Sequence, residues 1–213
     1  MDKLHIINQR IQFSYIKSGV NSFMDDRKNY SNYNNSLRYD CDNRSYLSKF
    51  PKQKTVILEC GFRPQDAFFE IDDGKVEEKQ EFVLDRLKID TSFLKKPLVK
   101  IEFSSLVVFE AEDEEGPEHE VEVDLLFKLI RICDGEKDCV QSWRYLYEID
   151  VENSIDELEV EMSQPFAVTF CDRPCSGCCE YIITVEGIDF EGDFDELRVI
   201  KPNLSAIATG NCE

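Results

Sequence analysis

Nine cysteines are the residues of this 213-residue chain whose types and spacing could do the most chemistry. Four of them crowd into residues 171–179, two flank the loop 133–139, and three stand apart. They are Cys41, Cys60, Cys133, Cys139, Cys171, Cys175, Cys178, Cys179 and Cys212. Inert structural cysteines are usually buried within an element, whereas nearly all of these lie at expected loops or strand ends. We therefore expect most of them to take part in bonds to other groups.

Three kinds of chemistry compete for these thiols. The gap of two residues between Cys175 and Cys178 is that of a zinc knuckle, but the gap of five between Cys133 and Cys139 departs from the usual second pair. A redox catalyst needs a helix N-terminus to lower the thiol pKa, and the loop 171–179 offers none. Disulfides are the favoured interpretation, and an odd count leaves at least one intermolecular bridge or free thiol. Zinc binding and unreactive reduced thiols stay open as alternatives.

The sequence offers few residues suited to other catalytic or cofactor chemistry. The chain has two histidines, His5 and His119, which leaves little room for general bases. Acidic segments at 72–74, 110–120 and 189–196 lack the twelve-residue spacing of a calcium loop and are better explained as solvated loops. No glycine-rich phosphate loop occurs among the nine glycines. We expect no enzymatic activity, no cofactor and no catalytic or metal-binding residues.

The elements that must position the cysteines have the period of β-strands. From Thr55 onward, apolar residues alternate with polar ones, as in Val121, Val123 and Leu125, and no segment has an apolar helical stripe. The expected strands span 55–60, 67–71, 81–89, 98–109, 121–129, 143–151, 158–162, 166–170, 181–185, 197–199 and 204–208. Alternation means one buried and one solvated face. The sequence predicts an all-β fold, an antiparallel two-sheet, jelly-roll-like β-sandwich with an extended N-terminal arm.

Charge divides the chain at the same point as the pattern of strands. The total is −19, but residues 1–54 hold ten Lys and Arg against five Asp, a net +5, which leaves −24 on residues 55–213. We therefore expect two parts, an N-terminal arm (1–54) and a β-sandwich domain (55–213). Phosphate backbones repel so acidic a body, so no nucleic-acid partner is expected. A basic arm is attracted to an acidic body, its own or that of a neighbour.

One segment of the arm is suited to joining another sheet. Ile11, Phe13 and Tyr15 alternate with polar residues, which is the period of a half-buried strand, and we take these three as the docking residues. An extended segment of this kind can add as a strand to an open sheet edge. A solvated tail with one apolar patch is the alternative.

The expected location follows from the cysteines and the missing targeting signals. No run of about 20 apolar residues occurs, so no membrane span is expected. Residues 1–10 lack the apolar stretch of a secretory signal. Disulfides nevertheless require an oxidising environment. A protein released by cell lysis, such as one on a spore surface, satisfies both conditions, and we expect an extracellular location at a spore or cell surface.

Several landmarks together resemble a family of small, Cys-rich β-sandwich proteins of unknown function from anaerobic spore-forming bacteria. They are Val56–Gly61, Leu98–Phe103, Phe127–Cys133, Trp143–Tyr145, Phe170–Asp172, Cys178–Val185 and Leu204–Ala208. That family also looks like the subunits of endospore appendages. The resemblance implies a jelly roll whose N-terminal connector disulfide-links stacked neighbours into pilus-like fibres. The present arm carries one cysteine, Cys41, where those connectors carry a closely spaced pair.

These observations lead to one hypothesis and one alternative. The hypothesis is a self-assembling structural protein in which the arm adds to the sheet edge of a neighbour. Cys41 then locks it by a disulfide to Cys60 or to a cysteine of the loop 171–179. Such a heterologous, head-to-tail contact does not close and generates a helical filament of one kind of subunit. The alternative is a monomeric zinc- or ligand-binding β-sandwich module.

Overall fold

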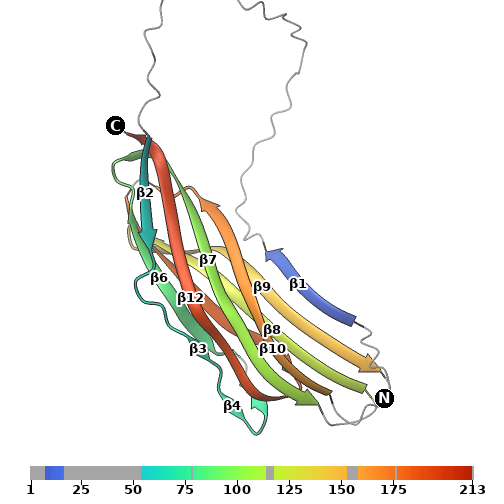
Figure 1. Ribbon diagram of the computed structural model, residues 1–213. Coiled ribbons are helices and arrows are strands. Elements are labelled where there is room, and N and C mark those ends of the chain that lie inside the picture. Colours follow the sequence, from blue (N-terminus) through green and yellow to red (C-terminus); the bar gives the residue numbers. More distant parts are fainter. Residues whose placement is uncertain are drawn as a thin grey trace, which may run out of the picture.

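The computed structural model describes residues 8–16, 54–77, 79–113, 118–152, 158–175 and 177–212 (Figure 1). In these ranges every regular element is a β-strand. The strands are β1 (Asn8–Ile16), β2 (Lys54–Cys60), β3 (Ala67–Phe68), β4 (Ile71–Asp72), β5 (Lys75–Val76), β6 (Glu81–Asp90), β7 (Leu94–Asp113), β8 (Glu118–Cys133), β9 (Glu136–Glu152), β10 (Leu158–Asp172), β11 (Cys178–Glu191) and β12 (Asp193–Cys212). The all-β prediction is confirmed.

The long strands form two antiparallel sheets. Sheet A has the order β1-β9-β8-β11-β6, and sheet B has the order β10-β7-β12-β2, with β3 also pairing with β12. When β1 and the two-residue strands are set aside, the eight remaining strands, numbered along the chain, follow the orders 2-7-4-5 and 1-8-3-6. These are the two sheets of a jelly roll. The predicted antiparallel β-sandwich is therefore the fold of this protein.

The core lies between the sheets and is lined by the alternating residues. Val121, Val123, Leu125, Phe127 and Leu129 of β8 are fully buried. The ring of Phe127 stacks on that of Phe166 from the other sheet, with 4.0 Å between centroids. Full burial of one such side chain stabilises the fold by about 1.5–3 kcal/mol.

Two pairs of expected strands are continuous in the structure. The segments 158–162 and 166–170 form β10, and 197–199 and 204–208 form β12. Each pair is separated by a proline, which lacks the N–H that a central strand needs. Pro165 is tolerated because β10 is the edge strand of sheet B. Pro202 is tolerated because the pairing of β12 with β7 is interrupted between Ile200 and Asn203.

A buried carboxylate joins the two sheets beside the end of β2. Asp85 of β6 accepts hydrogen bonds from the backbone N–H groups of Arg63 (3.2 Å), Arg86 (2.7 Å) and Leu204 (3.3 Å). A Cβ atom at Gly61 would lie 1.8 Å from Asp85 Oδ2, so a glycine must stand there. The carboxylate thereby links β6 of sheet A to β12 of sheet B.

Candidate assembly site: the β9 edge and the cysteine-bearing end

The segment expected to dock pairs with the sandwich of its own chain. In β1, Ile11 lies opposite Tyr147, Phe13 opposite Tyr145, and Tyr15 opposite Trp143. All nine residues of β1 are in register with β9, which makes β1 the fifth strand of sheet A (Figure 1). The strand predicted from the alternation at Ile11–Tyr15 is therefore present, and its acceptor is the β9 edge.

The β9 edge carries a row of aromatic residues. Trp143, Tyr145 and Tyr147 are buried, and burial raises the pKa of both tyrosines. The hydroxyl of Tyr145 donates a hydrogen bond of 2.9 Å to Oε1 of Gln164 in β10. Trp143 meets Phe170 of β10 edge-to-face, with 6.5 Å between centroids. The row thus holds the two sheets together at the side of the sandwich where β1 pairs.

The register aligns the apolar positions of β1 with this row. Residues directly opposite in an antiparallel pair lie on the same face of the sheet. Positions 11, 13 and 15 therefore fall on the face of Trp143, Tyr145 and Tyr147, which is the core face. Without β1, the seventeen-residue strand β9 would be an open edge, which invites uncontrolled pairing with other chains.

Most of the cysteines gather where β8 and β10 end and β9 and β11 begin. Cys133 lies opposite Cys179, Cys139 opposite Ile130, Cys171 opposite Lys100, and Cys178 opposite Asp90. The backbone of Cys212 pairs with Leu94, the first residue of β7, at the same end of the sandwich. We call this the cysteine-bearing end.

Of the other cysteines, Cys60 lies apart from the cysteine-bearing end. Cys60 ends β2 and lies opposite Ser205, part of the way down sheet B. Cys41 falls outside the described residues. Its expected partners, Cys60 and the cysteines of the loop 171–179, belong to the sandwich.

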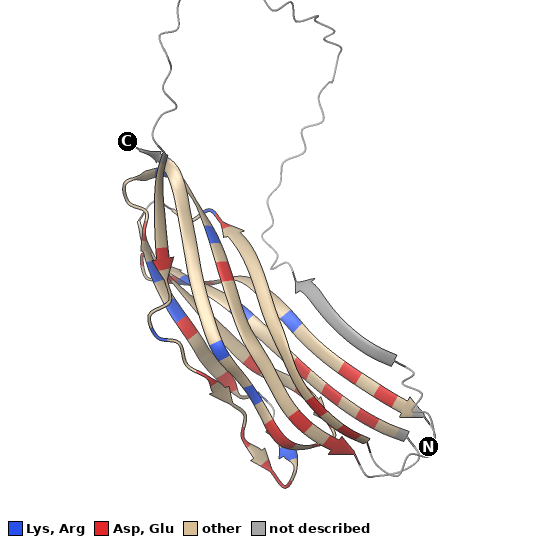
Figure 2. Cartoon of the chain, in the orientation of Figure 1, with Lys and Arg blue, Asp and Glu red and all other residues tan. Residues whose placement is uncertain are grey.

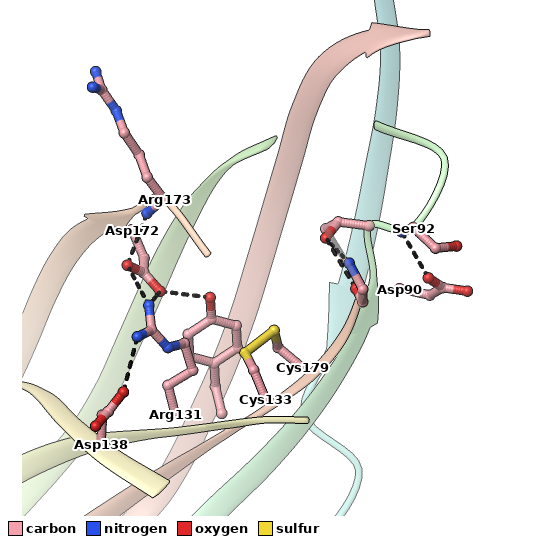
Figure 3. Close-up of a disulfide and its surroundings, with 11 residues drawn as sticks. Asp90, Ser92, Arg131, Cys133, Asp138, Asp172, Arg173 and Cys179 are labelled. Carbon is pink, nitrogen blue, oxygen red and sulfur yellow. Dashed lines mark hydrogen bonds and ion pairs between the residues drawn. A yellow bond between two sulfur atoms is a disulfide. The ribbon is translucent and has the colours of Figure 1, made fainter. Parts of the chain in front are cut away.

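A disulfide joins Cys133 of β8 to Cys179 of β11, with 4.5 Å between the Cα atoms (Figure 3). The expectation of disulfides within the subunit is met for this pair. Sequence spacing could not identify the pair, because its members are 46 positions apart in the chain. The pairing arises from the register of two neighbouring strands.

Five cysteines of the sandwich are free and exposed. They are Cys60, Cys139, Cys171, Cys175 and Cys178. The Cys139 thiol donates a hydrogen bond of 3.6 Å to the Gln141 carbonyl oxygen. Exposed thiols are open to oxidation and to exchange with an incoming cysteine. Four of the five lie at the cysteine-bearing end.

An ionic network anchors the segment that carries Cys171 and Cys175. The Arg131 guanidinium donates to both oxygens of Asp172 (3.1 and 3.0 Å) and to Asp138 (3.1 Å), as Figure 3 shows. The hydroxyl of Tyr181 donates to Asp172 at 2.8 Å, as does the backbone N–H of Arg173. Burial, and then the Asp172 carboxylate, raise the pKa of Tyr181. Asp172 thus ties the end of β10 to β8 and β11.

A cavity of about 230 Å³ lies beside this network. Its walls are formed by Arg131, Cys133, Asp134, Glu136, Asp138 and Cys175. Cys133, one of the four residues considered for zinc, is taken by the disulfide. Within the described ranges, no group of three or more His, Cys, Asp or Glu residues is arranged to hold a metal ion.

The opposite end of the sandwich is acidic (Figure 2). There a cavity of about 410 Å³ is lined by Lys75, Gly192 and five carboxylates, and Lys75 Nζ lies 2.8 Å from Asp193. The carboxylates are Asp113, Glu120, Asp150, Glu191 and Asp193. Burial, and then the charges of Asp150 and Glu191, raise the pKa of Glu120. The three acidic segments of the sequence therefore meet at one end, which their separation along the chain could not indicate.

Comparison with known proteins identifies a family for the sandwich part of the chain. The fold defines the protein as a jelly-roll β-sandwich with an added N-terminal strand. Residues 54–209 match a family described as a domain of unknown function (DUF4489), and the chain belongs to that family. The match begins at the first residue of β2 and ends within β12. No curated protein matches the chain. No helix in the described ranges is long and apolar enough to cross a membrane.

Proposed function

We propose that this protein is a self-assembling structural subunit of an extracellular fibre on a spore surface. Each subunit gives its N-terminal strand to the β9 edge of the next, and disulfides between subunits lock the contact. The observation that carries the proposal is the pairing of β1 with β9, because that strand comes from far outside the sandwich. Such a subunit is not an enzyme, and its partner is another copy of the same chain.

The length of the connection favours exchange of β1 between subunits. Residues 17–53 separate the end of β1 from the start of β2, and 37 extended residues reach at most about 130 Å. A strand on so long a connection can pair with its own β9 or with that of a neighbour through the same contacts. Exchange of an identical element between copies costs little for this reason.

The distribution of charge and thiols supports a head-to-tail arrangement. The two ends of the sandwich differ, since carboxylates gather at one and free cysteines at the other (Figure 2). The acidic end of one subunit then attracts the basic arm of another, since residues 55–213 carry a net charge of −24 and residues 1–54 a net charge of +5. Unlike ends in contact form an open chain and not a closed ring of two.

The proposed lock is a disulfide from Cys41 to an exposed cysteine of the neighbour. Of the expected acceptors, Cys60, Cys171, Cys175 and Cys178 are free thiols, whereas Cys179 is bonded to Cys133. Two thiols form this bond by losing two protons and two electrons to an external oxidant such as dioxygen, so the exposed candidates can react without breaking the internal disulfide.

An engineered disulfide distinguishes pairing within a chain from pairing between chains. Arg10 lies opposite Glu148, so Arg10→Cys with Glu148→Cys should link β1 to its acceptor, because directly opposite Cα atoms are about 4.5–5.5 Å apart. We expect a covalent ladder on a non-reducing gel, and mass spectrometry should identify peptides joined through positions 10 and 148 of different chains. The matched control is Arg10→Cys alone. A 10–148 link found only within monomers contradicts the proposal.

A further inference from the structure

The four edge strands of the two sheets differ in how well they are shielded from pairing with another chain. Sheet A ends at β6 and β1, and sheet B ends at β10 and β2. The loop after β2 covers part of the β6 edge, since the N–H groups of Phe62 and Gln65 donate to the carbonyl oxygens of Arg86 and Leu84 (2.9 and 2.8 Å). The β10 edge carries Pro165, which interrupts pairing. Strand β2 has no proline and ends its sheet among the described strands.

The outer face beside the β2 edge is apolar. Val56 and Leu58 are 62% and 65% exposed, and Leu98 and Ile207 are 38% and 37% exposed. The register places Leu58 beside Ile207 of β12, and Val56 beside Thr209, which in turn lies beside Leu98 of β7. The four side chains form one patch over three strands, which we call the β2 patch. A contiguous exposed apolar patch is typical of a protein–protein contact.

We propose that β2 pairs antiparallel with β2 of a second copy, around a two-fold axis that passes through Ile57. The two B sheets then form one continuous sheet, and the two β2 patches merge across the axis. This contact is isologous and is distinct from the contact made by β1. It does not depend on the proposed function.

The pattern of β2 selects this register. Val56 and Leu58 are exposed on the outer face, whereas Ile57 packs against the core. Opposed residues share a face, so Val56 must oppose an outer residue of the partner strand, and a shift by one residue would oppose it to Ile57. With Ile57 opposite Ile57, Val56 lies opposite Leu58 and all seven residues of β2 are paired. In the same register, the neighbouring residues Thr209 and Val56 of one copy lie in line with the neighbouring residues Leu58 and Ile207 of the other.

Charge favours the antiparallel direction and a second β2 as the partner. In this register no charged residue lies opposite one of like charge, because Lys54 falls opposite Cys60 and Glu59 opposite Thr55. In-register parallel pairing would instead set Lys54 beside Lys54 and Glu59 beside Glu59. The β10 edge of a neighbour is a poorer partner, because Glu159 and Glu161 are exposed along it and Pro165 interrupts it. If the fibre forms by β1 exchange, the two-fold contact joins its subunits in pairs.

Disulfide trapping in the full chain tests the register. One preparation carries Val56→Cys and a second, labelled with ¹⁵N, carries Leu58→Cys, both with Cys60→Ser. These positions are more than half exposed, so the variants should fold. Directly opposite Cα atoms are about 4.5–5.5 Å apart and permit a disulfide, whereas the diagonal neighbours 56–56 and 58–58 are about 7–8 Å apart and do not.

After mixing under reductant and reoxidation, we expect peptides that link position 56 of an unlabelled chain to position 58 of a labelled one. Each preparation alone should give no 56–56 or 58–58 link. Ile207→Lys in both preparations should lower the yield severalfold, whereas Phe68→Lys, at an exposed site on β3, should not change it. No 56–58 link in the mixture, or an equal yield of 56–56 and 58–58 links in the separate preparations, overturns the proposal.

Discussion

Phe13 of β1 lies directly opposite Tyr145 of β9, at the centre of the strand pair that completes sheet A. Tyr145 is fully buried and reaches across the sandwich to Gln164 of β10. This pair therefore connects the N-terminal arm to the core of the sandwich.

A charge at Phe13 should weaken docking of the arm. Phe13→Asp places a carboxylate in line with the buried aromatic row, where an unpaired charge is strongly unfavourable. We expect loss of fibres in negative-stain electron microscopy. Ser14→Asp is the matched control, because position 14 lies opposite Arg144 on the other face of the strand and the change should be tolerated. Fibres formed equally by both variants would argue against docking through this face.

The internal disulfide should stabilise each subunit without being required for assembly. Closing a loop of 46 residues contributes about 4 kcal/mol through the reduced entropy of the unfolded chain. Cys133→Ala with Cys179→Ala should lower the free energy of unfolding by about this amount in urea titrations. Cys139→Ala, at an exposed thiol, should change it little. Equal stability of the double variant and the unaltered protein would mean that the bond does not form.

The Arg131 network should protect the cysteines beside it. Arg131→Ala removes the guanidinium nitrogen that donates to both oxygens of Asp172, and we expect loss of this partly buried pair to cost about 1–3 kcal/mol. We also expect Cys171 and Cys175 to react several times faster with a thiol reagent, followed by mass spectrometry. Arg86→Ala removes a surface pair with Glu180 and should leave these rates unchanged. If the two variants react alike, the network does not control access to the thiols.

Lowering the pH should remove the destabilising effect that carboxylates at the acidic end have on the folded protein. Burial and neighbouring carboxylates raise the pKa values of Glu120 and Glu122 in the folded state. The folded protein then binds protons more readily than the unfolded chain, so these groups destabilise it at neutral pH, and the penalty fades as the pH falls through the raised pKa toward 4.5.

The matching measurement compares urea midpoints at pH 7 and at pH 4.5. Glu120→Gln with Glu122→Gln should be more stable than the unaltered protein at pH 7, and the difference should nearly vanish at pH 4.5. Glu159→Gln, at an exposed position of β10, should show no such trend. A difference that grows as the pH falls has the wrong sign for this explanation.

The strands could be predicted because alternation is a local signal. The positions from Val121 to Leu129 were expected on one face, and all five are buried in the core. The joining of strands across Pro165 and Pro202 could not be predicted, because it depends on which strand lies at an edge and where the pairing shifts. A periodic pattern indicates strands and faces, whereas edges and shifts in pairing are properties of the assembled sheet.

The candidate site was only partly accessible to the same reasoning. Ile11, Phe13 and Tyr15 stood out by their period, but nothing in the sequence identified β9 as their acceptor. The pairing of Cys133 with Cys179 and the meeting of the acidic segments likewise depend on strand order. The alternating aromatics Trp143, Tyr145 and Tyr147 indicate a strand with an aromatic face, but only the register of the folded chain sets them opposite β1.

Negative-stain electron microscopy of the full chain and of a chain lacking residues 1–50 tests the central claim most directly. A synthetic peptide of residues 5–18 provides the matched addition, since it contains all of β1. We expect fibres of the full chain, soluble subunits without fibres for the shortened chain, as monomers or as pairs joined through β2, and fewer and shorter fibres of the full chain when excess peptide occupies the β9 edges. Fibres of the shortened chain without peptide would contradict the central claim.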